Sequence, residues 1–161
     1  MVTKYYKAII YSDGTLEVSD YKGGADTPYK THSVYWFTNL NGEISKWNVS
    51  NVTNMSYMFA YSEFNGNISK WDVFNVKDMS HVFEYSCFNG NISEWNTSNV
   101  TDMSFMFAYS EFNGNISKWD VSKVKNMNSM FEYSKFNGLL SNWNVSNVTD
   151  MDCMFVQWGY F

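Results

Sequence analysis

Few side chains of this sequence are of the types that carry acid–base, nucleophilic or metal chemistry. The 161 residues include two histidines, His32 and His81, and two cysteines, Cys87 and Cys153. The cysteines lack the spacing of a metal or redox site, so we expect two unpaired thiols. No P-loop, H-E-x-x-H, G-x-S-x-G or G-x-G-x-x-G motif occurs. The sequence therefore predicts no catalytic residue, no metal site and no cofactor.

A repeat of 24 residues organises the rest of the chain. The segment FAYSEFNGNISKWDV occurs at 59–73 and again at 107–121, and tryptophan recurs at every 24th residue from 47 to 143. Valine, methionine and phenylalanine columns keep the same register, starting at Val52, Met55 and Phe59. A fixed period with apolar columns is typical of a solenoid, in which each unit packs only on its neighbours.

The pattern inside one repeat predicts a strand followed by a short helix. Residues 68–73 end in the alternation Trp71-Asp-Val73, which favours a strand. Residues 76–83 have apolar side chains at i, i+3, i+6 and i+7, the spacing of a helix face. An Asn-Gly pair such as Asn65-Gly66 predicts a turn with positive φ. We therefore expect a repeat solenoid of the β/α type with about five 24-residue coils.

The two ends of the chain differ from the repeats, as terminal caps do. Residues 1–33 alternate around Ser12-Asp13-Gly14 and predict an N-terminal β-hairpin cap. Residues 34–155 form the repeat region, and residues 156–161 form an apolar C-terminal cap. That tail would either cover the last coil or join two copies in a homodimer.

One carboxylate pair could act as a glycosidase pair. Asp72 and Asp120 lie two repeats apart, which is roughly 10 Å in a stack with strands ~4.8 Å apart, a separation that suits an inverting mechanism. Asn48, Asn96 and Asn144 occupy the same column. An exposed face on which Asn and Asp alternate is therefore the better explanation.

Charge and hydropathy exclude two classes of partner. The net charge is −5, and all 11 basic residues are lysine. Nucleic-acid binding surfaces are net basic and use arginine for bidentate contacts, so we expect no direct nucleic-acid binding. No apolar run approaches the roughly 18 residues of a membrane span. The N-terminus shows no signal peptide and no lipidation cysteine, which favours a cytoplasmic location.

Another protein is the partner class that remains, and two columns of variable residues are candidates for its contact. Phe74 stands where Ser50, Ser98, Ser122 and Ser146 occur in the other repeats, and an exposed aromatic residue is a typical partner anchor. A chance substitution is the alternative explanation. The candidates on the strand-lined face are Lys70, Asp72, Phe74, Glu94, Asn96, Lys118 and Asp120, and those on the helical side are Tyr57, His81 and Phe105.

The block FNxxISxWDVSNVTDMSxMF, found over about residues 37–155, resembles a repeat of roughly 25 residues in surface lipoproteins of mycoplasmas and low-GC bacteria. Those proteins have no known function and are relatives of BspA-like leucine-rich repeats. The resemblance implies a leucine-rich-repeat-like β/α solenoid with Ile68, Trp71 and Val73 inward, and a cell-surface location. This chain departs in its shorter repeat and in Lys123, which interrupts the asparagine column Asn51, Asn75, Asn99 and Asn147.

Three functions fit these observations. The first is a non-enzymatic solenoid that binds another protein through its strand-lined face. The second is a small acidic inhibitor of a host defence nuclease, made by a phage or mobile element and anti-CRISPR-like. The third is a surface adhesin, which would need exposed planar aromatic rings and ranks last because the tryptophans are expected to point inward.

Overall fold

The computed structural model describes residues 5–10, 16–21 and 44–157 of the chain. Strand β1 (Tyr5–Ile10) pairs antiparallel with strand β2 (Leu16–Tyr21), from Tyr5 opposite Tyr21 to Ile10 opposite Leu16. This pairing agrees with the predicted hairpin, whose turn lies outside the described residues. Most of the predicted N-terminal cap and the end of the C-terminal cap lie outside them as well.

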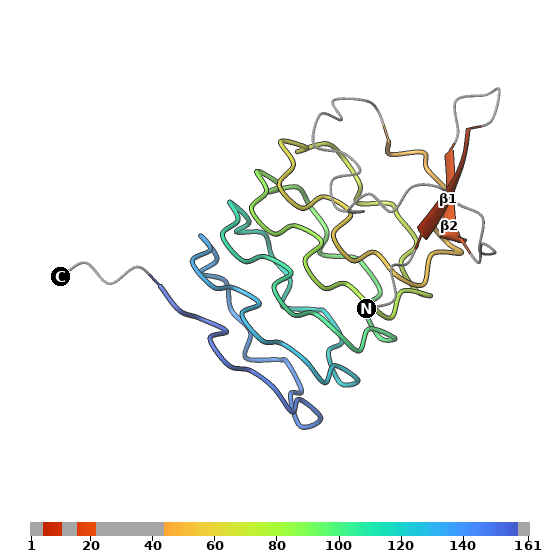
Figure 1. Cartoon of the computed structure of the whole chain (residues 1–161). Coiled ribbons are helices and arrows are strands. Elements are labelled where there is room, and N and C mark those ends of the chain that lie inside the picture. The colour runs from red at the N-terminus through yellow and green to blue at the C-terminus, as the bar shows by residue number, and fades with distance from the viewer. Residues whose placement is uncertain (1–4, 11–15, 22–43, 158–161) are drawn as a thin grey trace.

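Residues 44–157 form successive coils that lie side by side in the order of the sequence (Figure 1). Each coil contacts the next through single-residue parallel bridges, which join Asn54, Asp78, Asp102, Asn126 and Asp150 at steps of one repeat. Backbone N–H groups around each bridge donate to carbonyls of the following coil, as from Met79 to Asp102 at 2.9 Å. The stack is therefore held by hydrogen bonds between coils.

The prediction of a β/α solenoid is wrong. Within residues 44–157 the structure has no helix and no strand, and turns and single bridges take their place. The leucine-rich-repeat-like architecture implied by the resemblance fails for the same reason. What is retained from the sequence is the register of the repeat and the inward direction of its apolar columns.

The predicted strand at 68–73 is replaced by a turn. Trp71 N–H donates to the Ile68 carbonyl at 3.1 Å, and Val76 N–H donates to the Val73 carbonyl at 2.9 Å. Ile68 and Trp71 are three residues apart, so a strand would direct them to opposite faces. A turn between them lets both side chains enter the core, where they are 1% and 4% exposed.

The predicted helix at 76–83 is interrupted by left-handed residues. His81 and Tyr85 have φ of 58° and 52°, far from the helical value near −63°. Their counterparts in the other coils, from Tyr57 to Cys153, are also left-handed. Consecutive turns place residues three apart on one side, as a helix does, which explains why the apolar spacing resembled a helix face.

The core is a set of apolar columns that run along the stack. Methionine and phenylalanine columns are fully buried in the inner coils, and the inward direction predicted for Ile68, Trp71 and Val73 is confirmed. The indole N–H of Trp71, Trp95, Trp119 and Trp143 donates to a carbonyl of the preceding coil at 3.0 to 3.1 Å. The tryptophans therefore contribute both buried area and a link between coils.

The glycine that follows each asparagine provides room, because none of Gly66, Gly90, Gly114 and Gly138 has a positive φ. This outcome contradicts the predicted turn conformation. A Cβ atom on Gly114 would lie 2.8 Å from the ring of Phe112, which is fully buried. The glycine column therefore allows the phenylalanine ring to pack across the backbone.

Candidate interaction surfaces

Seven of the predicted binding residues lie at matching positions on three successive coils. They are Lys70, Asp72 and Phe74 in one coil, Glu94 and Asn96 in the next, and Lys118 and Asp120 in the third, and all are exposed. Hydrogen-bonded neighbouring chains lie about 4.8 Å apart, so these side chains form one continuous surface. We call this surface the Phe74 face.

The acidic and amide side chains of the Phe74 face cap turns. Asp72 accepts from the Phe74 N–H at 3.1 Å, and Asp120 accepts from the Ser122 N–H at 2.9 Å. Asn96 lies between them and accepts from both the N–H and the hydroxyl of Ser98. The two carboxylates of the candidate glycosidase pair are thus engaged in stabilising turns.

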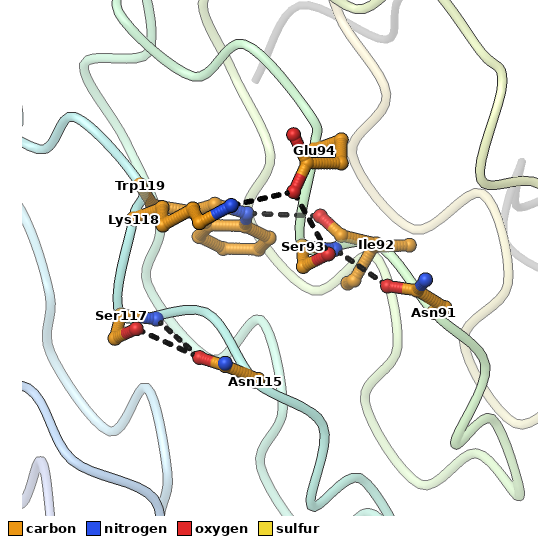
Figure 2. Close-up of polar contacts among 8 residues, drawn as sticks. All are labelled: Asn91, Ile92, Ser93, Glu94, Asn115, Ser117, Lys118 and Trp119. Carbon is orange, nitrogen blue, oxygen red and sulfur yellow. Dashed lines mark hydrogen bonds and ion pairs between the residues drawn. The ribbon is translucent and has the colours of Figure 1, made fainter.

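Charges of opposite sign alternate along one column of the Phe74 face. Lys118 Nζ lies 3.0 Å from Glu94 Oε1 in the preceding coil (Figure 2). The hydrogen bond and the charge of Lys118 lower the pKa of Glu94, and Lys70 on the other side lowers it further. Hydrogen bonds from the Ser122 hydroxyl and N–H lower the pKa of Asp120. Both carboxylates therefore keep their charge to a lower pH than they would in an unfolded chain.

The backbone on both sides of Lys118 is anchored, as Figure 2 shows. Ser117 donates its N–H and hydroxyl to Asn115 Oδ1 at 3.0 and 2.8 Å, and Trp119 donates its indole N–H to the Ile92 carbonyl at 3.0 Å. Lys118 therefore presents its ammonium group from a fixed stretch of chain.

Amide side chains link the Phe74 face to neighbouring coils. Asn99 Nδ2 donates to the Phe74 carbonyl at 2.9 Å, and Asn75 Nδ2 donates to the Ser50 carbonyl at 2.8 Å. Lys123 interrupts this column, as the sequence indicated, and its Nζ donates to Asn99 Oδ1 at 2.8 Å. The backbone of Phe74 is thus held by a side chain of the next coil.

The three remaining predicted residues, Tyr57, His81 and Phe105, form a half-buried stack of rings, called here the His81 stack. The His81 ring lies 4.2 Å from Tyr57 and 4.7 Å from Phe105, nearly parallel to both. His81 Nδ1 lies 2.9 Å from Glu84 Oε2. Burial raises the pKa of Tyr57, and Glu84 and Asp78 raise it further.

A second aromatic column, four residues further on, escaped the sequence analysis. Tyr61, Tyr85, Tyr109 and Tyr133 form a ladder with ring centroids 4.7, 4.3 and 5.0 Å apart, and we call it the tyrosine ladder. Burial and then the charge of Glu132 raise the pKa of Tyr109 to about 12. The signal was present as tyrosine at every 24th residue from 61 to 133.

The structure keeps the two predicted groups apart. Among the described residues, no hydrogen bond, ion pair or ring contact joins the Phe74 face to the His81 stack. The His81 stack instead belongs with the tyrosine ladder, because Tyr57 and Tyr61, His81 and Tyr85, and Phe105 and Tyr109 are the left-handed residues of the same runs of turns.

A polar pocket of about 320 Å³ lies between the last two coils. Its lining includes Asn113, Asn115, Ser117, Asn137 and Asn142, which offer neutral donors and acceptors. The pocket adjoins Leu139, which stands where the other repeats have an asparagine and is 79% exposed. The sequence analysis did not single out this position.

The described residues contain no group of three or more histidine, cysteine, aspartate or glutamate side chains that could hold a metal ion. Cys87 and Cys153 are free and exposed. Within the same part of the chain, no helix has the length and apolar character needed to span a bilayer.

Comparison with protein families places the chain. Residues 30–108 and residues 85–161 each match the family described as "Mycoplasma protein of unknown function, DUF285". The matches confirm the predicted mycoplasma-type repeat and do not extend to BspA-like or leucine-rich repeats. No curated protein and no solved structure matches the chain. Since the two matches together cover residues 30–161, this chain belongs to the DUF285 family of repeat-containing proteins.

Proposed function

We propose that this chain is a non-enzymatic binding protein that contacts another protein through the Phe74 face. The supporting observation is the exposure of Phe74, whose side chain is 46% exposed where the other repeats carry serine. Aromatic side chains are enriched among the residues that contribute most to protein–protein binding. Nothing in the folding of one coil requires a phenylalanine here, because serine occupies the position elsewhere.

The rigidity of the backbone around Phe74 supports this role. Asp72 accepts from the Phe74 N–H, and Asn99 donates to the Phe74 carbonyl. A side chain presented from a fixed backbone loses less conformational freedom when a partner binds. The Phe74 face is therefore preorganised for recognition.

Mixed charges surround Phe74. Lys70 and Asp72 precede it in the same coil, and Glu94 and Lys118 continue the alternation across the stack. Charged groups at the edge of an interface act mainly on orientation and association rate. Together with the net charge of −5, this pattern favours a protein partner with its own mixed charges.

Photo-crosslinking from position 74 tests the proposal. A benzophenone side chain at position 74 should capture a partner from lysate of the source organism. Position 61 is the matched control, because Tyr61 is an aromatic residue with 44% exposure and lies in the tyrosine ladder. Capture of the same protein from position 61 alone would place binding on the tyrosine ladder and overturn the proposal.

A further inference from the structure

Backbone N–H groups without acceptors line the C-terminal end of the stack. The N–H groups of Met127, Ser129, Phe131 and Tyr133 donate to carbonyls of the last coil at 2.7 to 2.9 Å, and every earlier coil donates to its successor in the same direction. Met151, Cys153 and Phe155 hold the equivalent positions in the last coil. Their N–H groups have no acceptor among the described residues. This edge therefore presents donors only.

Apolar side chains accompany these donors. Met151 is 42% exposed, whereas the four other methionines of its column are 0% exposed. Phe155 is 52% exposed, whereas the other phenylalanines of its column are at most 1% exposed. Val145 is 39% exposed. We call the surface formed by Val145, Met151, Phe155 and the three free N–H groups the end face.

We propose that the end face binds a coil of this same 24-residue repeat carried by another polypeptide. Inside the stack, four coil-to-coil contacts show what covers this set of residues. In each, the next coil supplies carbonyl acceptors opposite the donors and an apolar stripe over the methionine and phenylalanine. An occupant of the end face must offer the same chemistry.

The direction of the hydrogen bonds argues against a tail-to-tail pair of copies. A two-fold arrangement would bring the donors of Met151, Cys153 and Phe155 against an identical row of donors. Those N–H groups would then be buried without acceptors, at a cost of about 1–3 kcal/mol each.

A head-to-tail arrangement of copies is opposed by the burial of the other end. Docking in that way would require the carbonyl edge of the first described coil, which includes Met58 and Ala60. These residues are only 4% and 1% exposed. The occupant is therefore a different polypeptide that carries the repeat and has an open carbonyl edge.

Fluorescence anisotropy with a labelled synthetic peptide tests the proposal. The probe has the sequence of residues 97–144, and its first coil can offer the carbonyls of Asp102, Ser104 and Met106. The full chain should bind it saturably, and Met151→Lys or Val145→Lys should weaken binding by about tenfold or more. Phe74→Lys, at a residue of similar exposure on another face, should leave binding unchanged.

Amide exchange of the full chain by NMR provides the second readout. The N–H groups of Met151, Cys153 and Phe155 should exchange rapidly in the free chain and become protected when the probe is added. Absence of binding at the highest soluble probe concentration would overturn the proposal, as would equal binding by Met151→Lys. Protection of these amides before the probe is added would also overturn it, since the chain itself or a second copy would then cover the end face.

Discussion

At the scale of single residues, the buried indole hydrogen bonds connect sequence to stability. Trp95 is 4% exposed and donates to the Ile68 carbonyl at 3.1 Å. Replacing Trp95 with phenylalanine keeps an aromatic ring and leaves that carbonyl without its donor. We expect the free energy of unfolding to fall by about 1–3 kcal/mol. Urea denaturation measures this change, with Tyr61→Phe as the exposed control, and equal stability of the two variants would contradict it.

The glycine column leads to a second prediction at this scale. Gly114→Ala introduces a Cβ atom 2.8 Å from the Phe112 ring, which cannot move because it is 0% exposed. Overpacking of this kind costs about 1–3 kcal/mol. Thermal unfolding should show a lower midpoint for Gly114→Ala than for the exposed variant Lys77→Ala. A midpoint equal to that of the wild type would mean that the ring has room to shift.

Residue periodicity identified the core and missed the backbone conformation. The 24-residue columns correctly placed Ile68, Trp71 and Val73 inside, because burial depends on register alone. Positive φ was assigned to the Asn-Gly pairs on general preference. The structure places it on residues such as Tyr61, His81 and Tyr85, whose bulk normally disfavours it. Stacking between coils offsets that preference, and such stacking depends on contacts across the repeat.

At the scale of elements, the tyrosine ladder should stabilise the stack. Tyr85 lies between Tyr61 and Tyr109, with ring centroids 4.7 and 4.3 Å away. Each aromatic pair contributes about 0.5–1.5 kcal/mol beyond burial. Tyr85→Ala should therefore lower the free energy of unfolding by roughly 1–3 kcal/mol, and Tyr85→Phe should change it far less. Equal losses in the two variants would show that the hydroxyl, and not the ring contact, is what matters.

The left-handed backbone at Tyr85 allows a matched comparison. Its φ of 52° costs an L-residue about 1–2 kcal/mol, and glycine avoids that cost. Tyr85→Gly should therefore be more stable than Tyr85→Ala in the same denaturation experiment, although both lack the ring. The reverse order would show that the position carries no backbone strain.

Titration of the ladder gives a prediction for alkaline pH. The pKa of Tyr109 is raised to about 12 by burial and by Glu132, whereas an unfolded tyrosine has a pKa near 10. Between these values the folded chain keeps a proton that the unfolded chain has lost. Stability is therefore unaffected by this group below pH of about 10 and falls as the pH rises toward about 12.

Phenolate absorbance measures this titration directly. One tyrosine should ionise well after the others, and Tyr109→Phe should remove that late step. Ionisation of all tyrosines near their ordinary pKa would contradict the proposed environment of Tyr109.

Element type was the part of the fold that the sequence could not supply. The i, i+3 spacing of Val76, Met79 and Val82 is shared by a helix and by consecutive turns, so apolar periodicity alone does not separate them. The deciding feature is the left-handed His81, which no helix pattern anticipates. Likewise, the turn from Ile68 to Trp71 replaced a strand because both side chains are buried.

At the scale of the whole molecule, the coils act as one stack with two distinct kinds of surface. The Phe74 face was predictable, because an aromatic residue among serines stands out in a repeat. The tyrosine ladder and the end face were not recognised. The first is a regular column that resembles a core column, and the second depends on where the hydrogen bonds between coils end.

The measurement that most directly tests the account is the dissociation constant of the protein crosslinked from position 74, compared between wild type and Phe74→Ser. The substitution restores the residue found in the other four repeats, so the fold should be unaffected. We predict binding weaker by about tenfold or more, as for an aromatic anchor. An unchanged dissociation constant for Phe74→Ser, together with weaker binding by Tyr61→Ser, would contradict the account and assign recognition to the tyrosine ladder.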